Sequence, residues 1–156
     1  MANRLENLRL TVNEYLRRCE PDKVCAYSSH LYGVAKFCTL LALKRKLDAE
    51  IAATCGMLHD IYYVIGGDSE NHAIPGAATA KQILLDARAY SDGEIEIITS
   101  AILHHSDKRE THAPYDELLK DADVMDHCFY NADFAIAEWE TLRYNNLLAE
   151  FGIDEN

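Results

Sequence analysis

The stretch of sequence that decides the fold is Ala-Thr-Cys-Gly-Met-Leu-His-Asp-Ile at residues 53–61. Its apolar residues predict a helix that is buried along its length, yet the run ends in two ionisable neighbours, His59 and Asp60. Burying an ionised carboxylate without a partner costs several kcal/mol after relaxation. A metal ion is one partner that removes this cost, so the stretch indicates a buried helix that ends at a metal site.

Apolar residues recur at helical spacing on both sides of this stretch, and the alternation typical of strands is almost absent. Asp48 has the position of an N-cap for the helix that contains the stretch, and Ser91 with Glu94 has the spacing of a capping box. Pro21 is expected to end the first helix and Pro75 to open the fourth. The predicted helices cover, approximately, residues 5–16, 27–41, 49–61, 75–84, 91–105, 118–129 and 134–148.

One short apolar run is ambiguous between a helix and a strand. Residues 61–65 could pass for a strand, but the sequence offers them no obvious partner strand. The last predicted helix begins with Phe134, Ile136 and Ala137 and is expected to pack on the core or on a second subunit of a homodimer. We therefore predict an all-α fold of six or seven helices, in a single domain that spans residues 1–156.

The composition is that of an ordinary globular protein, with 49% hydrophobic and 26% charged residues among 156. This length corresponds to one domain. Lys and Arg number 15 against 26 Asp and Glu, which gives a net charge of −11. An acidic chain is a poor generic partner for a nucleic-acid backbone and for anionic membranes, so neither is expected to bind.

The five cysteines are widely scattered and form no C-x-x-C pair, so zinc-ribbon and thioredoxin-type sites are excluded. They are predicted to be free thiols in a reducing cytosol. The sequence contains no apolar run of about 18 residues, and its first residues lack the basic-then-apolar plan of a signal peptide. A cytoplasmic location is therefore expected.

Histidine and aspartate residues form the features suited to chemistry. A single histidine on an apolar helix face is more often a satisfied core residue than a ligand, so each feature is weak alone. Together, imidazole and carboxylate are the ligands of divalent ions such as Mn, Fe, Co, Zn or Mg, and an ion with open positions can activate water to attack phosphate esters. The features are His30, the pair His59-Asp60, His72, the pair His104-His105, and the run Asp121-Ala122-Asp123.

The order His30, His59-Asp60, Asp123 resembles the H…HD…D pattern of the HD-domain metal-dependent phosphohydrolase superfamily. Residues 29–35 look like that family's first helix motif, residues 53–61 like its AALLHDI segment, and residues 119–126 like its DADRLD segment. The resemblance covers about residues 25–130 and implies an all-α HD domain, with residues 131–156 as a C-terminal helix on its core. It also implies that His30, His59, Asp60 and Asp123 bind the catalytic metal, with Asp121 in support.

Two further segments, residues 71–77 and 101–106, are similar to segments with which some HD subfamilies bind a second metal or substrate phosphate. The resemblance assigns His72 and His105 to these positions and implies a second metal, with Asp60 as the bridge. The other interpretation is one metal, with His72 and His105 as phosphate contacts or proton donors. Asp60, His72 and His105 are the expected catalytic residues, and the expected cofactor is one or two ions of Mn, Fe, Co, Zn, Ni or Mg.

Other polar residues near these motifs have simpler expected roles. Lys108 and Arg109 could contact substrate phosphates, or they could form a solvated pair of charges in a loop. His104 is expected to be structural because it lies about 100° round the helix from its neighbour. His112 is expected to be solvated. His127 lies one helical turn past Asp123, so it could support the site, but a surface residue is the preferred interpretation.

The resemblance implies hydrolysis of a small phosphorylated metabolite, with a nucleotide as one candidate, by metal-activated water. The ester type stays open, because His59-Asp60 is followed by Ile61-Tyr62-Tyr63 rather than by the Gly-Lys of the cyclic-dinucleotide phosphodiesterases. The alternative is a catalytically silent HD-fold regulatory module that binds a nucleotide or a metal. A helical scaffold with coincidental histidines would need four motifs to align by chance.

Overall fold

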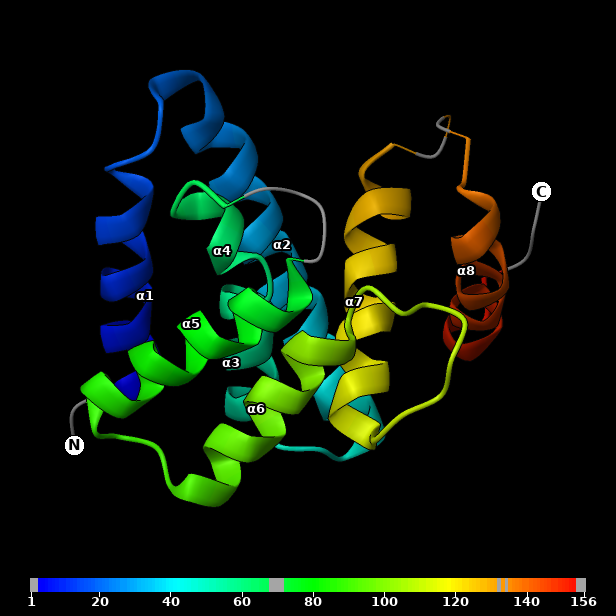
Figure 1. The fold of residues 1–156 in the computed structure, drawn as a ribbon. Helices are drawn as coiled ribbons and strands as arrows, with labels where there is room; N and C mark the ends of the chain where they lie inside the picture. Colours follow the sequence, from blue (N-terminus) through cyan, green and yellow to red (C-terminus); the bar gives the residue numbers. More distant parts are fainter. Residues whose placement is uncertain (1–2, 68–71, 132, 134, 154–156) are drawn as a thin grey trace.

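The computed structural model describes residues 3–67, 72–131, 133 and 135–153. Within these ranges the chain is all-α, as predicted, with seven helices of ten or more residues, one single-turn helix and no strand (Figure 1). The helices are α1 (Arg4–Leu16), α2 (Pro21–Arg45), α3 (Ala49–Leu58), α4 (Ile61–Val64), α5 (Ala73–Ala87), α6 (Asp92–His104), α7 (Pro114–Tyr130) and α8 (Glu138–Phe151).

The local signals for helix starts are confirmed. Asp48 caps α3, because its side chain accepts hydrogen bonds from the backbone N–H groups of Glu50 and Ile51. Ser91 and Glu94 form the predicted capping box at the start of α6. These contacts satisfy backbone donors that the first helical turn leaves without a partner.

Several predicted boundaries are wrong by a few residues. Pro21 lies five residues beyond the end of α1 and begins α2, where a proline costs no hydrogen bond. The fourth predicted helix begins at Ala73 rather than Pro75, because proline is tolerated within a first turn. The last helix begins at Glu138, after Ile136 and Ala137, and Phe134 lies outside the described residues.

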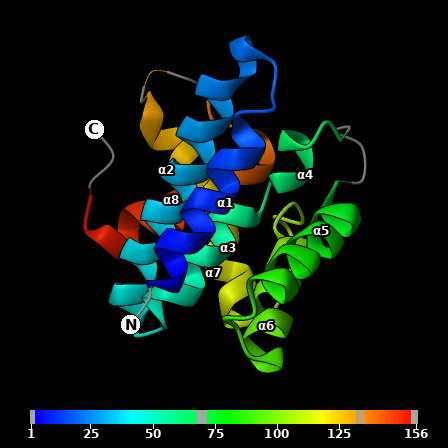
Figure 2. The same ribbon diagram turned by 90° about the vertical axis from the view of Figure 1, so that its left-hand side faces the viewer.

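Helix α3 occupies the middle of the bundle, and every residue from Ile51 to Leu58 is buried. It packs against α1, α2, α6 and α7. Figure 2 shows α1 lying across α2 and α3, while α5 and α6 lie together at one side. Because α3 is apolar all round, its C-terminal end delivers the next two residues, His59 and Asp60, into the interior.

Gly56 sets how closely α2 and α3 approach. A Cβ atom at this position would lie 2.6 Å from the Cα atom of Ala35 on α2. This Cα is a backbone atom, so it cannot move aside by a change of side-chain rotamer. Gly56→Ala is therefore expected to lower the free energy of unfolding by about 1–3 kcal/mol, measured by chemical denaturation. Gly93→Ala on α6 is the matched control, because an added Cβ there meets no atom within 4 Å. An unchanged stability in Gly56→Ala would contradict the close packing.

The run at residues 61–65 is helical rather than a strand. Ile61–Val64 form the single turn α4, and Asp60 lies between α3 and α4 with φ −111° and ψ 20°. The break in the helix at this point turns the side chains of His59 and Asp60 toward the same interior space.

At the other side of the molecule, α8 packs on α7 (Figure 1). Among the described residues, no helix combines the length and apolar character needed to cross a membrane. All five cysteines are free thiols, and Cys38, Cys55 and Cys128 are buried as small apolar side chains.

Candidate metal centre

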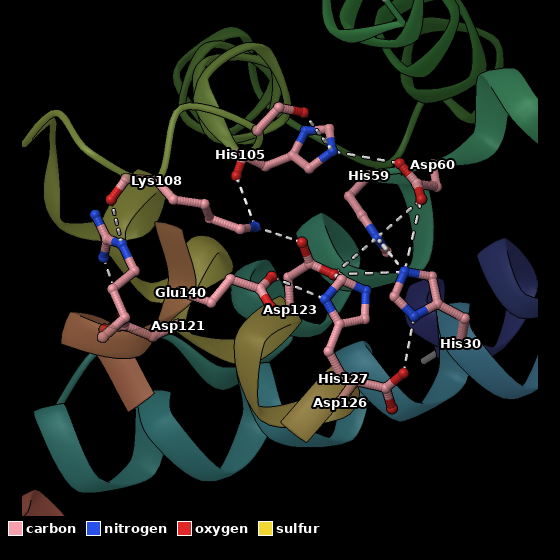
Figure 3. Close-up of polar contacts among 12 residues, drawn as sticks. His30, His59, Asp60, His105, Lys108, Asp121, Asp123, Asp126, His127 and Glu140 are labelled. Carbon is pink, nitrogen blue, oxygen red and sulfur yellow. Dashed lines mark hydrogen bonds and ion pairs between the residues drawn. The ribbon is translucent and has the colours of Figure 1, made fainter. Parts of the chain in front are cut away.

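The six residues predicted to bind metal converge at one place, and Figure 3 shows five of them pointing toward one another. Two come from the middle of long helices and four from helix ends, where the chain changes direction. The six are His30 in α2, His59 and Asp60 between α3 and α4, His72 before α5, His105 after α6, and Asp123 in α7.

The first group of ligand atoms belongs to His30, His59 and Asp60. The Nε2 atoms of the two histidines lie 3.1 Å apart, and they lie 3.6 and 3.5 Å from Asp60 Oδ2. Asp123 Oδ1 is 3.4 Å from His30 Nε2 and 3.9 Å from His59 Nε2. Two imidazoles and two carboxylates thus face one small volume.

The second group belongs to His72, His105 and the other oxygen of Asp60. The two Nε2 atoms again lie 3.1 Å apart, and they lie 3.6 and 3.3 Å from Asp60 Oδ1. The hydroxyl of Ser106 lies 3.0 and 3.2 Å from the same two nitrogens. The carboxylate of Asp60 therefore divides its oxygens between two groups of histidines.

Each histidine of the two groups uses its other ring nitrogen for a hydrogen bond that sets its orientation. Nδ1 of His59 lies 2.8 Å from Gly56 O, and Nδ1 of His105 lies 2.6 Å from Ile102 O. A carbonyl oxygen only accepts, so in both rings Nδ1 carries the proton and the lone pair of Nε2 faces the cluster.

The same orientation holds in the other two rings. Nδ1 of His30 lies 2.8 Å from a carboxylate oxygen of Asp126, and Nδ1 of His72 lies 3.0 Å from the hydroxyl of Tyr63. Ligating histidines in proteins almost always have such a partner on the second nitrogen.

The two carboxylates at the centre are ionised; Asp123 is buried and Asp60 is partly buried. Burial raises the pKa of the Asp60 carboxyl, but the neighbouring His59 and His105 outweigh it and hold that pKa well below its usual range. Burial acts the same way at Asp123, where Lys108 contributes most to lowering the pKa. Oδ1 of each carboxylate is buried and accepts no hydrogen bond from the described residues. Buried acceptors of this kind fit a bound cation.

The two central histidines differ in charge. Burial lowers the pKa of His59 to about 4, so this ring is neutral and ready to bind metal at neutral pH. Burial also lowers the pKa of His30, but hydrogen bonds to Asp126 and Asp60 outweigh it and raise the pKa to about 10. The carboxylates thus attract positive charge to this point, and a proton and a metal ion compete for it.

Three further residues, none of them among the predicted ligands, also belong to this centre. Asp126 holds His30, and α2 has Gly33 facing Asp126, where a Cβ atom would overlap its carboxylate. His127 stacks on His30 with ring centroids 5.2 Å apart, and its Nδ1 lies 2.9 Å from Glu140 on α8. His127 is thus both exposed, as expected, and in contact with the residues of the centre. Its side chain is 46% exposed, but Nε2 lies 3.5 Å from Asp123 Oδ1.

Lys108 and Arg109 have different surroundings. The Nζ atom of Lys108 contacts Asp123 Oδ2 and donates to His105 O at 2.9 Å, and its side chain is 6% exposed. Arg109 is exposed and lines a separate cavity beside α8. Of this predicted pair, Lys108 alone lies at the centre.

The remaining polar residues lie away from the centre. His104 Nδ1 bonds to buried Asp116 at 2.7 Å, which agrees with a structural role. His112 stacks on His104 at 4.0 Å and bonds to the ammonium group of Lys120, so the prediction of a solvated side chain is wrong. Asp121 pairs with arginines of α2 and α8 and supports the fold around the centre rather than the ligands.

A cavity of about 310 Å³ opens onto the centre. This volume lies at the lower end of the range of small-ligand pockets, which is about 300–1,000 Å³. Its walls combine the predicted ligands with side chains from α8, and they are His30, Asp60, Tyr63, His72, His105, Ser106, Lys108, Asp123, His127, Trp139 and Glu140.

Similarity to known proteins agrees with this geometry. The HD domain family matches residues 27–130, more than half of the chain. Over 96 residues the chain is 32% identical to Ribonuclease Y of Chlorobium phaeovibrioides, a match that covers 62% of this chain but 17% of that protein. Over 119 residues it is 34% identical to an uncharacterized protein of Clostridium beijerinckii, with 71% of this chain and 74% of that protein covered. No solved structure matches the chain. The chain belongs to the HD domain family.

Proposed function

We propose that this HD domain is a metal-dependent phosphohydrolase that acts on a small phosphorylated metabolite. The observation that carries the proposal is the division of the Asp60 carboxylate between two pairs of histidines. Oδ2 faces His30 and His59, while Oδ1 faces His72 and His105. His30 and His59 with Oδ2 would hold one ion, and His72 and His105 with Oδ1 would hold a second, so the arrangement favours two ions over one.

The donor set supports the choice of metal. Four imidazoles with two carboxylates suit Mn, Fe, Co, Ni or Zn better than Mg, which prefers oxygen ligands. Asp123 would complete the first group. When bound, such ions supply Lewis acidity, which activates water and neutralises negative charge on a phosphoryl oxygen.

The chain's own residues supply binding and proton transfer. Lys108 brings a positive charge to the wall of the cavity, where it would contact a phosphate oxygen as a point charge. Hydrogen bonding to Glu140 raises the pKa of His127, so this imidazole holds a proton more firmly than an ordinary histidine. His127 lines the cavity, and in this proposal it gives that proton to the leaving oxygen.

A small substrate fits this chain better than RNA. One relative is named a ribonuclease, but this chain spans 17% of its length. The cavity is about 310 Å³, and the net charge is −11. Binding a polynucleotide requires clustered Lys and Arg along its backbone, which an acidic chain does not favour.

The proposal is tested by metal analysis combined with an assay of phosphate esters. We expect the purified protein to carry one or two divalent ions per chain. We also expect it to release phosphate from nucleoside monophosphates or from glycerol 3-phosphate. Asp60→Asn serves as the metal-deficient control. Wild-type protein that carries no divalent ion and releases no more phosphate than Asp60→Asn contradicts the proposal.

The alternative function, a regulatory module that binds without turnover, uses the same residues. The complete set of ligands and the neighbouring Lys108 and His127 favour an enzyme over a decayed site. Protein that holds metal and gains thermal stability from a nucleotide, yet forms no product with any ester, would support the module instead.

A further inference from the structure

Trp139 is the only tryptophan of the chain, and it lies in the first turn of α8. Its side chain is 58% exposed, yet it lines the same cavity as the two histidine groups. Because the Trp139 side chain is exposed, it adds little to the core of the fold. It does offer an apolar face to a ligand in the polar cavity.

We propose that Trp139 is the platform on which the aromatic base of a nucleotide stacks while its phosphate lies at the histidine–aspartate cluster. This inference rests on the proposed function and names its substrate class. It makes Trp139 a specificity-determining residue, which selects nucleotides over phosphate esters that lack a ring.

The position of Trp139 is fixed from two sides. The next residue, Glu140, is buried and bonds to His127 Nδ1 at 2.9 Å, which ties the first turn of α8 to α7. One turn further, Arg143 Nε donates to Lys108 O at 2.8 Å, which ties the same helix to the loop after α6. The backbone of α8 that carries Trp139 is thus held beside the cavity by contacts to α7 and to the loop after α6.

The chemistry of the cavity supports an aromatic ligand with a phosphate. Lys108, whose side chain is 6% exposed, and the predicted ligands suit an anion, whereas Trp139 and Tyr63 give the wall its aromatic surface. A volume of about 310 Å³ suits one small ligand, so a mononucleotide fits better than a strand. Stacking on an aromatic side chain tolerates every base, because every base has a π-face.

A second copy of the chain is the other occupant to consider. Leu142 follows Trp139 by three residues and is 73% exposed, so a dimer through α8 would cover both side chains. Leu142, however, lines the separate cavity beside α8 and not the one at the metal centre. Leu142→Ala is therefore the matched control.

The experiment uses the tryptophan fluorescence of the purified chain with its own metal. Because Trp139 is the only tryptophan, the signal reports on this position alone. We expect saturable quenching by AMP and UMP and none by glycerol 3-phosphate. In calorimetry, Trp139→Ala is expected to reduce the preference for AMP over glycerol 3-phosphate by about 5- to 150-fold, the range that base stacking gives. Trp139→Phe is expected to restore most of it.

Three results would overturn the inference. The first is an absence of quenching by either nucleotide, and the second is an unchanged preference in Trp139→Ala. The third is a dimer that both Trp139→Ala and Leu142→Ala convert to monomers without any effect on AMP binding. Fluorescence and calorimetry need no turnover, so the two proposals can fail separately. Quenching without hydrolysis contradicts the enzyme, and hydrolysis without quenching contradicts the platform.

Discussion

Replacing Asp60 by asparagine is expected to remove both metal binding and hydrolysis, with kcat/KM falling at least about 1,000-fold. Asparagine keeps the size of the side chain but loses the charge and one of the two oxygens. Those oxygens lie 3.3–3.6 Å from the Nε2 atoms of all four histidines, so one substitution disturbs both groups. The measurements are metal content by mass spectrometry and steady-state kinetics on the best ester.

Two further aspartate variants provide reference activities against which the loss in Asp60→Asn can be compared. Asp126→Ala removes the carboxylate that orients His30, and loss of such an outer partner typically costs about 10–100-fold in metal affinity or activity. Asp86→Ala changes an exposed carboxylate on α5 and is expected to match the wild type. The expected order of activity is therefore Asp86→Ala, then Asp126→Ala, then Asp60→Asn. Full metal content in Asp60→Asn would show that this carboxylate does not bridge.

Much of the fold could be predicted from the sequence because its signals are local. Apolar spacing and the caps at Asp48 and Ser91 fix where helices form, and these features depend on a few neighbouring residues. The short turn α4 could not be told from a strand, since residues 61–65 are apolar in either case. The packing of the surrounding helices decides its structure, and this packing cannot be read from residues 61–65 alone.

The candidate ligands were predicted because the resemblance assigns them by order along the chain. The supports were harder to find. His127 follows Asp123 by one helical turn, which already indicated a possible supporting role, and Asp126, three residues after Asp123, shares the same face. Glu140 has no such signal, because its contact with His127 depends on how α8 folds back on α7.

Lys108 and Arg109 also show that contacts between distant segments cannot be read from the sequence. Both are basic, both follow the histidine pair, and the sequence treats them alike. In the structure the loop turns Lys108 inward to Asp123 and leaves Arg109 outside, partly because Arg143 of α8 holds the carbonyl of Lys108. A contact between segments 35 residues apart decides which of the two reaches the site.

Removing the metal with a chelator is expected to lower the free energy of unfolding by about 4 kcal/mol, the contribution of a ligand present at about 1,000 times its Kd. For a chain of this length that corresponds to a fall in Tm of roughly 8–15 °C. The reason is that bound ions would link α2, α3, α6 and α7 through the histidines and aspartates of the centre. Without metal, the buried Oδ1 atoms of Asp60 and Asp123 accept no hydrogen bond from the described residues. Differential scanning calorimetry with and without chelator measures the change.

The variant Asp60→Asn separates this effect from a general action of the chelator, because a protein that binds no metal has none to lose. Its Tm is expected to be the same in both buffers, close to that of the chelated wild type. If the chelator leaves the Tm of the wild type unchanged, a helical scaffold is favoured over a metal centre. The chelated wild type is nevertheless expected to keep its helices at 20 °C in circular dichroism. The buried apolar residues of α3 and its neighbours form a core that does not include the ion, and a chain of 156 residues buries enough surface to fold without one.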